Sequence, residues 1–221
     1  SIFLQVFLQD LSESVRISAA KKVSDLQKLM VFFRQEKNSV VRDALLVCMV
    51  DLLIAGSEKF PESFCQEILS QVESLSLLEK VLSQAKNPTL QVMAVEKIND
   101  ENLLVTQALQ GGFAGVRKAA AERLTGESAL KKVKEGSKSK DKVVYRIVKE
   151  KLDCIQQKDT SVKEKNQQCE MICLSLEKLA HSVPTPFFKN QFQVILNQWL
   201  ATTEQYQAPW LKRFLSAEEI C

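Results

Sequence analysis

The chain has 221 residues, of which 26% are charged and 45% are hydrophobic, and its formal net charge is +3. This balance is typical of a folded globular protein and excludes a disordered chain, whose hydrophobic content would be much lower. A net charge so close to zero indicates no particular partner by itself. The low content of turn formers, 6 Gly and 5 Pro, favours long helices over a β fold.

Cysteine usage and the N-terminus bear on the compartment. The six cysteines form no CxxC pair, and they are Cys48, Cys65, Cys154, Cys169, Cys173 and Cys221. Most lie in apolar helical patterns, which favours reduced thiols over disulfides and predicts a cytoplasmic location. The opening segment SIFLQVFLQD lacks the basic region and cleavage site of a signal peptide. No apolar run approaches the ~18 residues of a membrane span, so no membrane partner is expected. Because the chain starts without Met, we expect it to be a portion of a longer protein.

Two copies of one helical pattern, 28 residues apart, occupy residues 116–152. Apolar side chains lie at offsets 0, 3, 4 and 8 in each copy, which places them on one face of an α-helix. The two sets are Val116, Ala119, Ala120 and Leu124, and Val144, Ile147, Val148 and Leu152. We expect Ala120 to be buried between neighbouring helices and Ala121 to lie on the opposite, more tolerant face.

The same offsets recur through the first two thirds of the chain. Further copies start at Val15, Val41, Phe64 and Leu90. A second apolar group stands 14 residues after each of the first five starts, at Leu29, Ala55, Leu78, Leu104 and Leu130. Successive starts are 23 to 28 residues apart, and a period of this size indicates two short helices per unit. The sequence therefore predicts a tandem helical repeat, with an irregular helical bundle as the alternative.

Polar residues mark where some of these helices begin. Asn87 precedes Pro88, which is the order expected of an N-cap residue and the first helical residue. Asn38 and Asp141 stand three residues before the start of their copies, as Asn87 stands before Leu90. Ser12 stands in the equivalent place before Val15. We therefore predict that Ser12, Asn38, Asn87 and Asp141 cap helices.

The repeated pattern ends near Cys154. Residues 156–168 are polar and predict either a linker or a solvated helix. A helical stripe follows, formed by Cys169, Ile172, Cys173, Leu176 and Leu179. The VPTP segment at 183–186 predicts an extended break, and amphipathic helices are expected at 187–199 and 208–214. The predicted organisation is a repeat array at 1–155, a polar linker or solvated helix at 156–168 and a helical subdomain at 169–221.

Several phrases resemble known helical families. Val-Arg-x-x-Ala, at Val15-Arg16, Val41-Arg42 and Val116-Arg117, resembles short HEAT-like repeats. This resemblance implies a curved solenoid with the second helices lining one surface. The fold that we expect is all-α, an α-solenoid of about six short HEAT-like helical hairpins followed by a small C-terminal helical subdomain. VRKAAAERL, KDKVVYRIVKEKL and the ending LEKLAHS…FKNQFQVILNQW…LKRFLSAEE resemble bacterial proteins grouped as domain of unknown function three-forty-nine. That resemblance spans most of the chain and implies further helical segments after it, without a settled activity.

Residues that could carry chemistry are few and scattered. Cys169 and Cys173 share a helix face and could supply two metal ligands, but the absence of a third ligand nearby favours core packing. His181, the only histidine, follows a helix end, where capping is favoured over catalysis. The segment 111–115 could present amides to a phosphate, but without a Walker lysine it is interpreted as a turn. Trp199 could stack on a base, although its apolar stripe favours the core. We expect no catalytic residue, no metal site and no cofactor.

Positive charge is concentrated in residues 116–151, whose net charge is +7, whereas residues 1–115 carry a net charge of −3. The phosphates of a nucleic acid could bind such a block, with an affinity that falls as salt rises. The alternative interpretation is a solvated lysine-rich surface. The candidate binding residues are Arg117, Lys118, Lys138, Lys140, Lys142, Tyr145, Arg146 and Lys149.

These observations favour a non-enzymatic helical-repeat scaffold that binds a protein partner along the repeat surface. The alternative is a nucleic-acid-binding module that uses the basic block at 116–151. A third class, a helical-repeat DNA glycosylase, would need an aromatic cleft with a suitable carboxylate, and the sequence shows no such combination.

Overall fold

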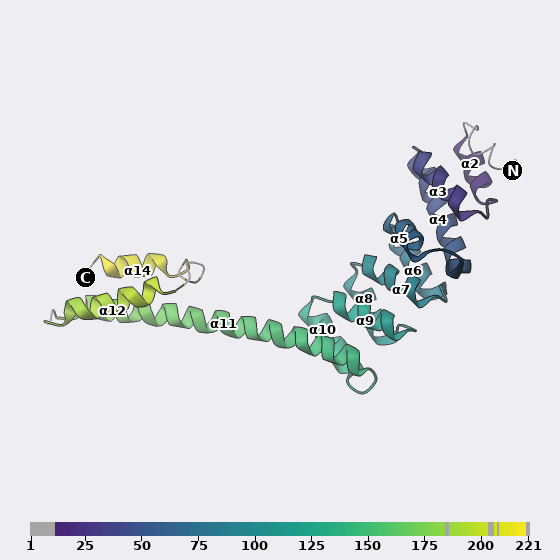
Figure 1. Ribbon diagram of the computed structural model, residues 1–221. Coiled ribbons are helices and arrows are strands. Elements are labelled where there is room, and N and C mark those ends of the chain that lie inside the picture. The colour runs from purple at the N-terminus through teal and green to yellow at the C-terminus, as the bar shows by residue number, and fades with distance from the viewer. Residues whose placement is uncertain (1–11, 184–185, 203–205, 207, 220–221) are drawn as a thin grey trace. The chain divides into compact units, whose positions relative to one another are not determined.

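The computed structural model describes residues 12–183, 186–202, 206 and 208–219, and every regular element within these ranges is helical (Figure 1). This confirms the all-α prediction. The elements are α2 (Glu13–Ala20), α3 (Leu26–Gln35), α4 (Ser39–Gly56), the 3₁₀ helix η1 (Ser57–Lys59), α5 (Glu62–Ser70), α6 (Leu75–Gln84), α7 (Pro88–Lys97), α8 (Glu101–Gln110), α9 (Ala114–Arg123), α10 (Glu127–Ser137), α11 (Lys142–Ala180), α12 (Phe188–Leu200) and α14 (Leu211–Glu218).

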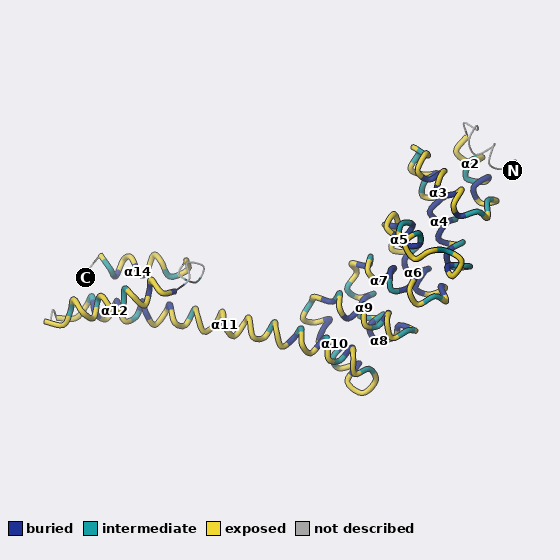
Figure 2. Tube along the Cα trace, viewed as in Figure 1, coloured by how far each residue is buried: buried dark blue, intermediate teal, exposed yellow. Residues whose placement is uncertain are grey.

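The chain divides into two compact units, Ser1–Lys151 and Leu152–Cys221, and the boundary between them falls within α11. Residues 156–168, for which the sequence left a linker or a solvated helix open, are helical and almost entirely exposed (Figure 2). Although α11 has 39 residues, neither it nor any other described helix combines the length and apolar character needed to cross a bilayer.

In the first unit, each helix packs against helices close to it in chain order. The even-numbered helices form one row in two segments, the first with α2 against α4 and α4 against α6, the second with α8 against α10. The odd-numbered helices form a second row, in which α5 contacts α7 and α7 contacts α9. Connections of three to five residues join successive helices, so neighbours in the chain run in opposite directions.

One predicted helix pair is instead a single helix. The sequence predicts two helices between Val41 and Phe64, but α4 continues to Gly56 and only η1 separates it from α5. Ala55, expected on the packing side of a second helix, is exposed near the end of α4. No Gly or Pro interrupts residues 39–55, so nothing ends the helix earlier. As a consequence, the repeated pattern lies on even-numbered helices up to α4 and on odd-numbered helices from α5 onward.

Most of the predicted helix faces are buried from α4 onward. Offsets 0, 4 and 8 are at most 9% exposed at Val41, Leu45, Met49, Leu90, Ala94, Ile98, Val116, Ala120, Leu124, Val144, Val148 and Leu152. In the first copy, Val15 is 38% exposed. The prediction for Ala121 is wrong. This residue is buried as completely as Ala120, because α9 packs against both α7 and α8 and so has two covered faces.

Three of the four predicted capping side chains form their bonds, whereas Ser12 stands at the N-cap position of α2 without a capping hydrogen bond from its side chain. The Oδ1 atom of Asn87 accepts a hydrogen bond from the Thr89 amide at 2.9 Å, and Pro88 follows as the first residue of α7. Asn38 accepts from the amide of Val41, and Asp141 caps the start of α11 in the same way. These bonds satisfy amides that lack a partner within the helix, which explains why the helices begin where the sequence predicts.

The second unit has a single apolar core between the end of α11, α12 and α14. The core residues are Cys169, Ile172, Cys173, Leu176, Trp199, Phe214 and Ala217. The rings of Trp199 and Phe214 are stacked, with centroids 4.2 Å apart and planes inclined by 9°. The predicted stripe on α11 and the core position of Trp199 are thus confirmed. Of the predicted break at 183–186, residues 184 and 185 lie outside the described part of the chain.

Candidate functional site

Arg117 is a predicted binding residue, but the structure places it inside the array. Its Nε donates to the Asp141 carboxylate at 2.8 Å, and its Nη1 donates to the carbonyl oxygen of Gly111 at 2.9 Å. Asp141 also accepts from the amides of Val143 and Val144 at the start of α11. Arg117 therefore joins the start of α9 to the start of α11, and its guanidinium is already engaged.

The protonation state of Asp141 follows from these bonds. Burial alone would raise the pKa of this carboxyl, but hydrogen bonds from Arg117 and from the α11 amides outweigh burial and lower the pKa. Asp141 is therefore ionised at neutral pH and neutralises the charge of Arg117. The segment 111–113 connects α8 to α9, and a Cβ atom at Gly111 would lie 2.6 Å from the Gln107 carbonyl oxygen. Only glycine fits where this tight connection presents its carbonyl to Arg117.

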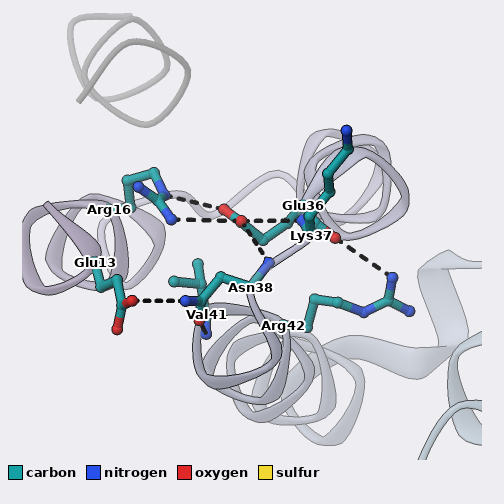
Figure 3. Close-up of polar contacts among 7 residues, drawn as sticks. All are labelled: Glu13, Arg16, Glu36, Lys37, Asn38, Val41 and Arg42. Atoms are coloured by element: carbon teal, nitrogen blue, oxygen red, sulfur yellow. Dashed lines mark hydrogen bonds and ion pairs between the residues drawn. The ribbon is translucent and has the colours of Figure 1, made fainter. Parts of the chain in front are cut away.

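A second network of this kind joins α2 to α4 (Figure 3). The Nε atom of Arg16 donates to the Glu36 carboxylate at 3.0 Å, and the same carboxylate accepts from the Asn38 amide. The Asn38 side chain, while capping α4, donates to Glu13 at 2.6 Å. Arg42 lies 4.3 Å above the ring of Phe33 and donates to the backbone oxygen of Glu36. Arg16 thus links α2 to the connection before α4, as Arg117 links α9 to the connection before α11.

Basic side chains on α7, α9 and α11 bind the carbonyl ends of the preceding odd-numbered helices. The pairs are Lys97 with Ser70 at 2.7 Å, Arg123 with Ile98 at 3.1 Å and Lys151 with Leu124 at 2.8 Å. The last carbonyls of a helix have no intrahelical partner and carry the negative end of its dipole, so a cation stabilises them. Burial lowers the pKa of Lys151. Sequence reasoning missed this row, although each cation stands seven residues after the start of its copy.

Lys118 and Arg146, two further predicted binding residues, lie near glutamates one turn later on their own helices. The Nζ atom of Lys118 is 3.7 Å from the Glu122 carboxylate, and the Nε atom of Arg146 is 3.9 Å from Glu150. All four side chains are more than half exposed. Such pairs add little stability, but each glutamate offsets one positive charge on the surface of the array.

The remaining predicted binding residues differ in their exposure to solvent and in their position along the chain. Lys138 and Lys140 lie in the connection between α10 and α11, and Lys142 is the first residue of α11. All three are exposed and form no ion pair with any residue that the structure describes. Lys149 is exposed further along α11, and Tyr145 is half-buried. The structure therefore brings three of the eight predicted residues together as unpaired cations.

Each unit also has a groove at its surface. In the first unit a groove of about 560 Å³ lies beside α4, and its apolar lining residues are Phe33, Leu46, Val47, Val72 and Leu77. Asp43 and Glu73 lie at the same groove and have no ion-pair partner among the described residues. In the second unit a groove of about 800 Å³ lies between α11 and α12 and is lined by Leu179, Phe187, Val194 and Ile195.

The five described cysteines are free thiols, and two of them lie in the core of the second unit. Cys221 lies outside the described residues. Cys169 and Cys173 are both completely buried in the core of the second unit, and burial raises the pKa of Cys173. Within the described ranges, no group of three or more His, Cys, Asp or Glu side chains could hold a metal ion. The two cysteines therefore act as core residues, and burial of the Cys173 thiol disfavours its reactive thiolate form.

Comparisons of the chain with models of protein families, with curated proteins and with solved structures found no match.

Proposed function

We propose that the first unit is an α-solenoid of short HEAT-like hairpins, related to the bacterial proteins of domain of unknown function three-forty-nine. The chain would act as a non-enzymatic scaffold that binds a protein partner along this array. Its described helices make their main contacts with helices near them in chain order, which is the packing expected of a quasi-one-dimensional array. The recurring ties made by Arg16 and Arg117, and by Lys97, Arg123 and Lys151, support a repeated unit.

The groove beside α4 carries the binding proposal. Its apolar lining comes mainly from α3, α4 and α6; Val47 is 38% exposed and Leu77 is half-buried, whereas Phe33, Leu46 and Val72 are buried at its floor. The carboxylates of Asp43 and Glu73 outnumber Arg42, the one cation among the lining residues, so the groove has a small excess of negative charge. A partner segment with an apolar side chain beside a lysine or arginine would fit both features, because it would bury apolar area and pair both carboxylates.

Photo-crosslinking tests this proposal. A photoreactive amino acid at Ser76, an exposed residue of the groove, should form one dominant protein adduct in native cells. The adduct should survive nuclease treatment and disappear with Val47→Glu, which places a like charge among the carboxylates. Val143→Glu is the matched control, because Val143 is 45% exposed and lies on α11 outside the groove. An adduct unchanged by Val47→Glu, or abolished by nuclease, would refute a protein-binding groove.

A further inference from the structure

The connections between helices of the first unit form two sets that differ in charge. Connections from an even-numbered to an odd-numbered helix span 21–25, 57–61, 85–87, 111–113 and 138–141. Connections in the opposite sense span 36–38, 71–74, 98–100 and 124–126. The first set contains six lysines and three acidic residues, whereas the second contains one lysine and three acidic residues. The sign of the net charge therefore differs between the two sets.

Each set lies along one edge of the array. Because successive helices run in opposite directions, the odd-numbered helices start at one edge and end at the other. The bond from Arg117 to Asp141 joins the starts of α9 and α11. The bonds from Lys97 to Ser70 and from Arg123 to the Ile98 carbonyl join the ends of α5, α7 and α9. The edge formed by the first set of connections is called the lysine edge below.

The positive charge of the lysine edge is largely uncompensated. Its six lysines are all exposed, and they are Lys21, Lys22, Lys59, Lys86, Lys138 and Lys140. None of their ammonium groups forms an ion pair with a residue in the described ranges. Two of the three carboxylates on this edge are neutralised by other cations, Asp25 by Lys28 at 2.8 Å and Asp141 by Arg117 at 2.8 Å. The ion pairs formed by Asp25 and Asp141 thus leave these six lysines without an ion-pair partner among the described residues.

We propose that the lysine edge binds the phosphate backbone of a single-stranded nucleic acid, a function beyond the protein binding proposed above. Helices packed in a row lie about 8–10 Å apart, so the connections recur along the edge at about that interval. A single extended backbone, with charges at shorter intervals, can place a phosphate at each lysine-bearing connection. The positive ends of the odd-numbered helices lie at the same edge and favour the same anion.

This edge differs from the basic block read from the sequence. It includes Lys59 and Lys86, which lie outside residues 116–151, and it omits Arg117, Lys118 and Arg146, whose charges are offset by carboxylates. Of the five connections that form the lysine edge, only the one at 111–113 has no lysine. The binding surface is therefore a line along the array rather than a patch at its end.

Two triple variants with the same loss of charge test the proposal. The edge variant is Lys59→Gln, Lys86→Gln and Lys140→Gln, and the control is Lys37→Gln, Lys118→Gln and Arg146→Gln. All six side chains are exposed, so neither variant should change the melting temperature appreciably. Binding of a fluorescent uridylate oligomer of about 30 nucleotides, long enough to span the edge, is measured by anisotropy over a series of salt concentrations.

The parent should bind at low salt with an affinity that falls steeply as salt rises. The edge variant should reduce the slope of log affinity against log salt by about 2, because three phosphate contacts are lost at about 0.7 each for a single strand. The control should keep the parental slope. Equal effects of the two variants, or no binding by the parent, would overturn the proposal. Equal competition by polyglutamate of matched charge would instead assign the edge to acidic protein segments. The crosslink at Ser76 does not depend on these lysines, so the two proposals fail separately.

Discussion

The two units of the chain are stabilised in different ways. In the first unit, Ser1–Lys151, apolar helix faces are joined by polar ties that recur from helix to helix, as with Arg117 and Arg123. In the second unit, Leu152–Cys221, one core contains the stacked rings of Trp199 and Phe214. Stability is therefore distributed along the first unit and concentrated in a few side chains of the second. Substitutions in the two units should therefore affect their stability in different ways.

The largest effect is expected for Ala120→Glu in the first unit. Ala120 has no exposed surface, so the variant would bury an unpaired charge at a cost of about 3–5 kcal/mol. Urea unfolding followed by circular dichroism would measure the loss. Ala114→Glu is the control, because Ala114 is exposed at the first turn of α9, where an acidic residue suits the helix dipole. An unchanged unfolding midpoint for Ala120→Glu would contradict the packing of α9.

Phe214→Ala should weaken the second unit by a similar or slightly smaller amount, about 3–5 kcal/mol, because it removes a buried ring stacked on Trp199. Hydrogen exchange should accelerate in α12 and α14 while α7 to α9 keep their protection. Leu215→Ala, a change at a 46% exposed residue of the same helix, should have little effect. Equal acceleration in both units would show that they do not unfold separately.

Arg117→Gln should destabilise the first unit by about 1–3 kcal/mol, because it leaves the Asp141 carboxylate and the Gly111 carbonyl with fewer partners. Arg146→Gln removes the same charge from an exposed pair and should cost less than about 0.5 kcal/mol. Chemical denaturation of both variants measures the difference. Equal losses would mean that Arg117 is a surface cation like Arg146.

The smallest effect concerns pH. The pKa values of Glu36 and Asp141 are lowered, despite the opposing effect of burial, by hydrogen bonds that include those from Arg16 and Arg117. Lowered carboxyl pKa values contribute stability that is present above the ordinary carboxyl pKa and is lost as pH falls through the lowered value, below about pH 4. Asp141→Asn keeps a side chain that can cap α11 but removes the charge that pairs with Arg117. The free energy of unfolding of this variant should therefore be lower than that of the parent at neutral pH and should fall less on acidification. Parallel pH profiles for parent and variant would exclude this linkage.

The elements that could be predicted depend on neighbours in sequence. Asn87 followed by Pro88 shows a helix start because the cap bond spans only two residues. The burial of Ala120 and Trp199 follows from apolar side chains spaced to lie on one helix face. Ala121 was placed wrongly because a single apolar face was assumed, whereas α9 has neighbours on two sides. The hydrogen bond between Arg117 and Asp141 was not predicted for a related reason, because the two residues are 24 positions apart in the sequence.

The sequence by itself determined the helical character, most helix faces, the caps and the excess of positive charge in residues 116–151, because each depends on composition or local periodicity. Tertiary structure alone decided that α9 is covered on two faces, by α7 and by α8. It also decided which cations are engaged, as Arg117 is, and which are free, as Lys86 and Lys140 are. That distinction depends on which carboxylates and carbonyls the packing brings within hydrogen-bond distance, and such distances arise only when the helices are assembled.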